Sequence, residues 1–269
     1  MARYSNGESV LSRLARLFDA FGPETRSSTV SELSERTGIP LPTVSRMVAE
    51  LVERGWLQRD AERRVWIGVR MWEMVSRAAP MRELSRTAMP FMTELHARIG
   101  QHVHLGVREG HEVLIVEQLS APIAVRSLIS TASRLPLHAS APGLVLLAHA
   151  SADVQESVLA EPLRGYTPHT VTDPRALRMV LSRVRRAGAA YCPGLIDPIA
   201  TSIAVPLRAA DGQVMASLSV VLPNTEAAMA VMPAVRAAGL RICRALADRR
   251  VSELAVLTED PRPLRTGTL

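Results

Sequence analysis

Apolar side chains recur at helical spacing across residues 29 to 55, in two short segments separated by a glycine. Thr29 and Glu32 have the spacing of a capping box at the start of the first segment, and Gly38 follows as its end. The second segment begins with prolines, which a first helical turn tolerates. Its apolar stripe consists of Val44, Met47, Val48, Leu51 and Val52. Two amphipathic helices joined by a tight turn are predicted, as in a helix-turn-helix.

The pattern changes to alternation after Gly55. The runs WLQR at 56–59 and RVWIG at 64–68 flank the polar turn DAER, which predicts a β-hairpin. Upstream, apolar residues at helical spacing predict a third helix over 10–21. Residues 1–68 therefore read as a winged helix-turn-helix. Such packing also occurs in helical subdomains and protein-interaction modules that never touch DNA, and that alternative stays open here.

The start of the second helix carries the candidate DNA contacts. A recognition helix presents its first turns to the major groove, and a wing can lie along phosphates. Arg46 is the strongest candidate, since its guanidinium matches guanine O6 and N7 or a phosphate pair. The alternative is a helical ion pair between Arg46 and Glu50. The predicted DNA-binding residues are Pro42, Thr43, Ser45 and Arg46 on the helix and Arg59, Arg63 and Arg64 on the wing.

Beyond the wing, helical spacing predicts a linker helix within 69–79 and a longer helix over 80–99. Alternating runs predict strands at 102–107, 113–119 and 123–129, and a later hairpin at 202–209 and 214–223. Helices are predicted after a loop near 136–150, at 151–160 and 173–188, and over 227–250. This order indicates an α+β domain over 80–255 with an antiparallel sheet, followed by a disordered tail at 256–269.

Composition adds looser limits. The chain has 269 residues, 47% of them hydrophobic, and a net charge of +6. Residues 1–80 hold 12 arginines against 10 acidic residues, so the placement of single arginines matters more than the total. Two isolated cysteines argue against a disulfide framework. No apolar run reaches the roughly 18 residues of a membrane span, and the start lacks a signal peptide's apolar core, so a cytoplasmic protein without a membrane partner is expected.

Catalytic and metal-binding motifs are weak. The sequence shows no nucleophile elbow, phosphate loop, HExxH or paired-carboxylate motif, so no catalytic residue and no cofactor is predicted. His102 and His104 lie two apart on a predicted strand and share a face, where His111 or His138 would have to complete a metal site. Packing or pocket lining is the preferred interpretation, and no metal is predicted. A small-molecule enzyme with an appended helix-turn-helix remains the alternative function.

Four pieces in order resemble the IclR family of bacterial transcriptional regulators over residues 8–250. They are the winged helix, WIG at 66–68, LPLHASAPGLVLLA at 135–148 and IAVPLRAADGQVMASLSV at 203–220. The resemblance implies an N-terminal winged helix-turn-helix, a linker helix and a C-terminal GAF-like domain that binds a small-molecule effector. It also implies homodimers, or dimers of dimers, on double-stranded operator DNA. The function implied is a regulator of a catabolic operon, with a repressor preferred over an activator.

The same resemblance implies the effector site. The corresponding residues are Ser140, Ala141, Pro142, Gly143, Ser202, Ser219 and Val221. The chain departs from the family's usual pattern at Leu144, where lysine is common, at 192–196, where acidic residues are common, and at Val221, where a hydroxyl is common. These changes predict an effector with an apolar or aromatic body.

Overall fold

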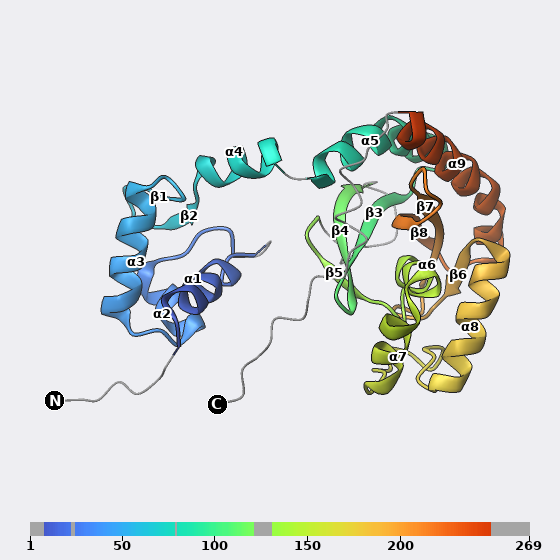
Figure 1. The fold of residues 1–269 in the computed structure, drawn as a ribbon, viewed down its shortest axis with the longest axis horizontal. Helices are drawn as coiled ribbons and strands as arrows, with labels where there is room; N and C mark the ends of the chain where they lie inside the picture. The colour runs from blue at the N-terminus through green and yellow to red at the C-terminus, as the bar shows by residue number, and fades with distance from the viewer. Residues whose placement is uncertain (1–7, 23–24, 79, 121–130, 249–269) are drawn as a thin grey trace. The chain divides into compact units, whose positions relative to one another are not determined.

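The computed structural model describes residues 8–22, 25–78, 80–120 and 131–248. The chain divides into two units, Met1–Ala79 and Pro80–Leu269 (Figure 1). Within the described ranges, no helix combines the length and apolarity that crossing a membrane requires. The predicted strand at 123–129 and the predicted tail at 256–269 lie outside the described residues.

The first unit is a three-helix winged fold followed by a fourth helix, α4. Its elements are α1 (Val10–Asp19), α2 (Val30–Thr37), α3 (Leu41–Glu53), β1 (Leu57–Arg59), β2 (Val65–Ile67) and α4 (Val69–Ala78). The predicted apolar stripes form its core, which contains Leu17, Leu33, Ile39, Val44, Val48, Leu51, Leu57 and Val65. The turn between α2 and α3 depends on Gly38, whose φ of 65° is one that few other residues adopt without strain.

Local hydrogen bonds fix where α2 begins. Thr29 Oγ1 accepts from the Glu32 amide at 3.2 Å, and the Glu32 carboxylate accepts from the Thr29 amide at 2.9 Å, which is the predicted capping box. The adjacent Ser28 exchanges backbone hydrogen bonds of 2.9 and 2.8 Å with Val65 of β2. The wing is thereby tied to the start of the helix-turn-helix.

Gly68 joins the wing to α4 at a very close backbone approach. Its amide donates to the carbonyl of Trp56 at 2.7 Å. A Cβ at this position would overlap the backbone of Gly55 and Trp56, so only glycine fits. The last residue of the WIG motif is therefore required by packing.

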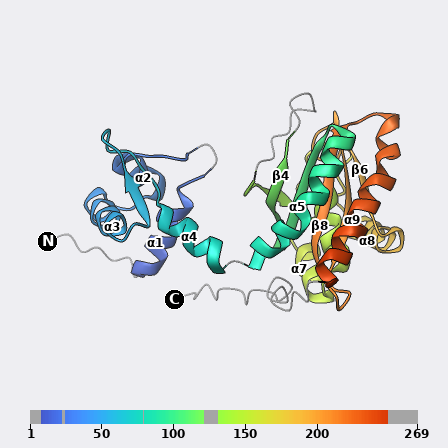
Figure 2. The same cartoon turned by 90° about the horizontal axis from the view of Figure 1, so that it is seen from above.

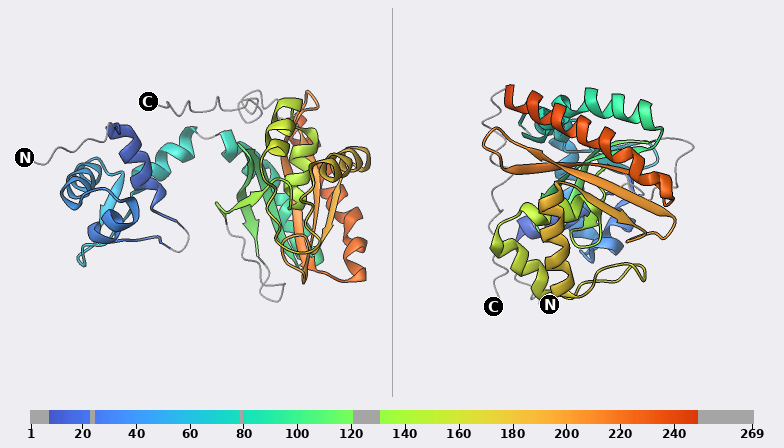
Figure 3. Two further views of the ribbon diagram at one scale, coloured as in Figure 1. Left: turned by 90° about the horizontal axis from the view of Figure 1, so that it is seen from below. Right: turned by 90° about the vertical axis from the view of Figure 1, so that its right-hand side faces the viewer.

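The second unit is a six-stranded antiparallel sheet with helices on both faces, in the order β5-β4-β3-β8-β7-β6 (Figures 2 and 3). The confirmed fold class is thus α+β, with a winged helix-turn-helix and a central antiparallel sheet. The elements are α5 (Pro80–Ile99), β3 (His102–Glu109), β4 (Glu112–Leu119), β5 (Arg134–Pro136), α6 (Ala141–His149), α7 (Ala152–Ala160), α8 (Pro174–Ala187), β6 (Ala190–Pro193), β7 (Ala200–Arg208), β8 (Val214–Pro223), the 3-10 helix η1 (Glu226–Val231) and α9 (Met232–Asp248).

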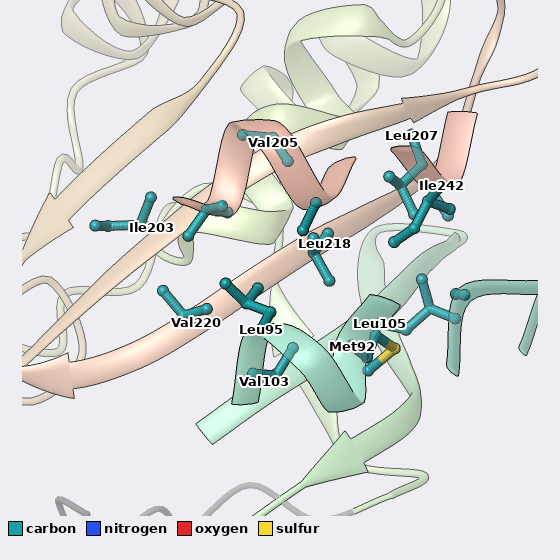
Figure 4. Close-up of a cluster of buried hydrophobic side chains, with 14 of the residues drawn as sticks. Met92, Leu95, Val103, Leu105, Ile203, Val205, Leu207, Leu218, Val220 and Ile242 are labelled. Atoms are coloured by element: carbon teal, nitrogen blue, oxygen red, sulfur yellow. The ribbon is translucent and has the colours of Figure 1, made fainter. Parts of the chain in front are cut away.

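One face of the sheet packs against α5 and α9. These helices lie side by side, and Arg241 of α9 pairs with Glu94 of α5 at 2.6 Å (Figures 2 and 3). Alternate residues of the central strands point into this layer, as period-two alternation requires. Figure 4 shows part of the cluster, with Met92, Leu95, Val103, Leu105, Ile203, Val205, Leu207, Leu218, Val220 and Ile242.

The opposite face is covered by α6, with α7 and α8 outside it (Figure 3). Helix α6 is apolar on all sides, and its residues from Ala141 to Ala148 are buried. Gly143 permits this depth because a Cβ there would lie 2.6 Å from the Leu137 backbone and 2.7 Å from the Pro136 carbonyl oxygen. The start of α6 is therefore pressed directly onto the loop that precedes it.

Three local assignments differ from the sequence prediction. Residues 134–136 and 190–193 form edge strands β5 and β6, which the alternation of apolar residues did not indicate. The final predicted helix is divided into η1 and α9 at Met232. Pro233 accounts for this division, since proline suits a first helical turn but not a helix interior.

Candidate functional site

The outer face of α3 presents the four predicted helix residues together. Val44 and Val48 are fully buried beneath it, which fixes the rotation of the helix. Pro42, Ser45 and Arg46 are exposed and Thr43 is partly exposed. Two hydroxyls and one guanidinium thus occupy the first two turns, the part of a recognition helix that enters a major groove.

Arg46 does not form the ion pair considered as its alternative role. Glu50 instead accepts from Arg54, one turn further on, at 2.9 Å. Within the described ranges Arg46 has no hydrogen-bond or ion-pair partner. Its charge is therefore available to an external anion.

The wing arginines separate into two kinds. Arg59 and Arg63 are exposed, and Arg63 adopts a left-handed φ of 61° in the turn. Arg64 instead folds back onto the fold: its Nε donates to Ser27 Oγ at 3.0 Å and its terminal nitrogen donates to the Ser27 carbonyl at 2.9 Å. Glu32 lies 3.7 Å from the same guanidinium. Arg64, the third predicted wing residue, thus links the wing to Ser27 and to Glu32 of α2.

Strand register brings the predicted effector residues onto the sheet face beneath α6. Ser202 of β7 pairs with Val221 of β8, and Val221 pairs with His102 of β3. Two residues along, Ser219 of β8 pairs with His104 of β3. Residues paired across strands point to the same face. Five side chains from three strands therefore share this surface.

The start of α6, Ser140–Gly143, reaches the same surface. Ser140 is the N-cap of α6; its hydroxyl accepts from the Gly143 amide at 3.1 Å and donates to the Pro136 carbonyl at 2.7 Å. The Ala141 amide donates to Ser202 Oγ at 3.3 Å. The N-terminus of α6, which carries partial positive charge, therefore adjoins the hydroxyl of Ser202.

Some polar atoms on this face are buried without a hydrogen-bond partner. They include His104 Nε2 and Ser219 Oγ, whose residues are each 1% exposed. Burial, together with the neighbouring His102, lowers the pKa of His104 to about 4, so the imidazole is neutral near pH 7. Buried polar atoms are nearly always paired, so this exception calls for an explanation.

Two neighbours on the face were not among the predicted site residues. Cys192 of β6 pairs with Ser202, and burial raises the pKa of its thiol to about 12, so it is not a thiolate. Gln118 of β4 pairs with His104. Cys192 belongs to a strand that was not predicted, and only the alternation of VLIVEQL gave a signal for Gln118.

The four histidines weighed for a metal site separate in the structure. The rings of His102 and His104 stack with centroids 6.2 Å apart. His111 contacts Glu161 and Ser157, whereas His138 bonds to the carbonyl of Arg164. Over the part of the chain that the structure describes, no three His, Cys, Asp or Glu side chains are placed to hold a metal ion.

Comparison with known proteins matches both units. The model of the IclR helix-turn-helix domain matches residues 10–61, and that of the bacterial transcriptional regulator IclR C-terminal domain matches residues 77–244. A solved structure of an IclR homolog from Microbacterium hydrocarbonoxydans, complexed with 4-hydroxybenzoate, is 40% identical with a TM-score of 0.85, covering 88% of this chain and 99% of that one.

Relatives of known function are also transcriptional regulators. The HTH-type transcriptional regulator KipR of Bacillus subtilis is 29% identical over 195 residues, covering 72% of this chain and 78% of KipR. The HTH-type transcriptional repressor AllR of Escherichia coli is 31% identical over 164 residues, covering 60% of each chain. With its winged helix-turn-helix and its sheet domain, the chain belongs to the IclR family of bacterial transcriptional regulators and is a DNA-binding regulator controlled by a small-molecule metabolite.

Proposed function

We propose that this protein is a repressor that an aromatic carboxylic acid releases from its operator. The observation that carries the proposal is the buried face beneath α6, where His104 Nε2 and Ser219 Oγ lack hydrogen-bond partners beside the apolar side chains of α6. A few polar groups in an apolar surround are typical of small-molecule sites. The relative complexed with 4-hydroxybenzoate supports an aromatic acid as the effector, and the repressor AllR supports repression.

We assign operator binding to the exposed start of α3 and to the wing. Arg46 reads or positions the DNA from the major groove, with Pro42, Thr43 and Ser45 beside it. Arg59 and Arg63 contact phosphates, since both are exposed. Arg64 supports the wing through Ser27 and contributes less directly.

The effector's carboxylate binds at the start of α6, in this proposal. The helix N-terminus attracts anions, and Ser202 Oγ, which accepts from the Ala141 amide, can still donate its own hydrogen there. Ser140 fixes the start of the helix as its N-cap. Pro142, Gly143 and Val221 complete the surface without adding charge. Leu144 is buried where a lysine would bring a cation, so this position contributes an apolar side chain and no charge.

Release of DNA by the acid is the direct test. A duplex selected by the full-length protein from a random pool serves as operator, and its affinity is measured by fluorescence anisotropy at fixed salt. We expect saturating 4-hydroxybenzoate to weaken binding by about 5- to 150-fold, the usual size of allosteric coupling. Unchanged DNA affinity, or tighter binding, with 4-hydroxybenzoate bound would contradict the repressor mechanism.

We also propose a homodimer that pairs through α1 and α4 of the first unit. An exposed apolar stripe runs along α4, with Val69 at 57%, Trp72 at 67% and Val75 at 59% exposure. Val10 and Leu11 of α1 are 66% and 74% exposed. A second copy of the same chain is the partner, because a pseudo-palindromic operator requires two recognition helices.

Breaking this stripe should separate the protomers. Trp72→Glu combined with Val75→Glu places charges in the proposed interface, so light scattering should report a monomer or a large loss of dimer. Operator affinity should fall with it. Met179→Glu is the matched control, since Met179 of α8 is an equally exposed apolar residue at 64%. An unchanged dimer in the double variant would refute this interface.

We propose further that the protein binds its effector without converting it, in keeping with relatives that are named as regulators. Since bacterial operators lie in the cytoplasm, this function places the protein there.

A further inference from the structure

The partnerless pair on β3 and β8 indicates what the far end of the effector carries. His104 Nε2 and Ser219 Oγ lie on strand-paired residues, so they point to one face as direct neighbours. An unsatisfied buried polar group costs free energy unless a ligand completes it. Ser217, two residues along the same strand, shows the ordinary alternative, because its hydroxyl donates to the Gly106 carbonyl at 3.3 Å.

The pair is separated from the carboxylate end by the width of a small aromatic ligand. Ser202 and His104 lie two strands and two residues apart in register. With strands about 4.8 Å apart and a rise of about 3.4 Å per residue, their Cα atoms are about 12 Å apart. The two side chains and a single substituted benzene ring together span this interval.

The chemistry of the pair favours a neutral group. A neutral imidazole nitrogen either donates or accepts, and a hydroxyl does both. A phenolic hydroxyl on the ligand satisfies both atoms in either imidazole tautomer. A second carboxylate would bring a buried charge with no cation among the paired residues, and such a charge is costly to desolvate.

We propose that His104 and Ser219 together bind a neutral hydroxyl group of the effector, and so select a hydroxylated aromatic acid over the unsubstituted acid and over a diacid. This inference rests on the proposed function, and it adds the group that distinguishes one aromatic acid from another. His104 is a specificity-determining residue in this assignment, and Ser219 is its partner.

Calorimetry on the full-length protein with three probes tests it: 4-hydroxybenzoate, benzoate and terephthalate. We expect 4-hydroxybenzoate to bind about 10-fold more tightly than benzoate, the size expected for one to two net hydrogen bonds. Terephthalate should bind more weakly than 4-hydroxybenzoate. The readout is the ratio of the affinity for 4-hydroxybenzoate to the affinity for benzoate. Because both affinities are measured on the same variant, a general loss of binding does not change this ratio.

Ser219→Ala and His104→Phe should each bring that ratio close to one. Ser219→Ala removes a single atom, so the test does not depend on whether His104→Phe folds. Ser217→Ala is the matched control and should keep the wild-type ratio, since its hydroxyl already has a partner. Equal binding of 4-hydroxybenzoate and benzoate by the wild type would overturn the inference while leaving the proposed function intact. Preference for terephthalate would do the same, whereas failure of all three acids to bind would overturn both.

Discussion

Replacing Arg46 by alanine is expected to lower operator affinity by about 5- to 150-fold, because a bidentate base contact is worth about 1 to 3 kcal/mol. The fold should be unaffected, since the side chain is exposed and has no partner within the described residues. Anisotropy titration at one salt concentration, using the duplex selected by the wild type, measures the change. A thermal melt of the variant should coincide with that of the wild type.

Arg54→Ala, at the C-cap of the same helix, is the matched control. Its guanidinium pairs with Glu50 at 2.9 Å, and both side chains are 63% exposed, so the pair contributes little. We expect its loss to change operator affinity far less than the loss of Arg46. Repeating the titration over a range of salt separates base from phosphate contacts, because a lost phosphate contact reduces the salt slope by about one. Equal affinities of Arg46→Ala and the wild type would remove Arg46 from the interface.

Replacing Gly143 by alanine is expected to destabilise the second unit by about 1 to 3 kcal/mol, the usual cost of overpacking. The added methyl group would lie 2.6 Å from the backbone of Leu137, which cannot rotate away as a side chain would. The start of α6 must then shift, and with it the amide that faces Ser202. We expect a lower melting temperature and, by calorimetry, a lower affinity for 4-hydroxybenzoate.

Gly165→Ala provides the comparison, since a Cβ there would meet only Thr172 at an ordinary 3.6 Å. It should melt within about a degree of the wild type, as surface substitutions usually change stability by less than 0.5 kcal/mol. If Gly143→Ala melts like Gly165→Ala, α6 is not held against its loop as described.

The first unit could be predicted in detail because its signals are local. A capping box, a left-handed glycine and prolines at a helix start each act within a few residues. The sequence also contained enough information to predict whether Glu50 pairs with Arg46 or with Arg54. An acidic residue N-terminal to its basic partner is the better helical order, and this favours Arg54 over Arg46. The anchoring of Arg64 at Ser27 was not decidable, because it spans 37 residues of chain.

The second unit was harder where elements are short or distant. Strands β5 and β6 have three and four residues, too few to show alternation, and each lies at an edge of the sheet. The pairing of His104 with Ser219 depends on register between strands more than a hundred residues apart. Both residues were considered separately in the sequence analysis, but only the three-dimensional structure shows that they are paired. The same holds for Cys192 beside Ser202.

The glycine at the end of the wing has a mechanical consequence. Where Gly68 meets Gly55 and Trp56, backbone touches backbone, with no side chain between them to yield under load. We therefore expect a rotation of α4 to reach the wing at Trp56 directly, through backbone contacts and not through a flexible side chain. The first unit should then move with its linker helix as one stiff body.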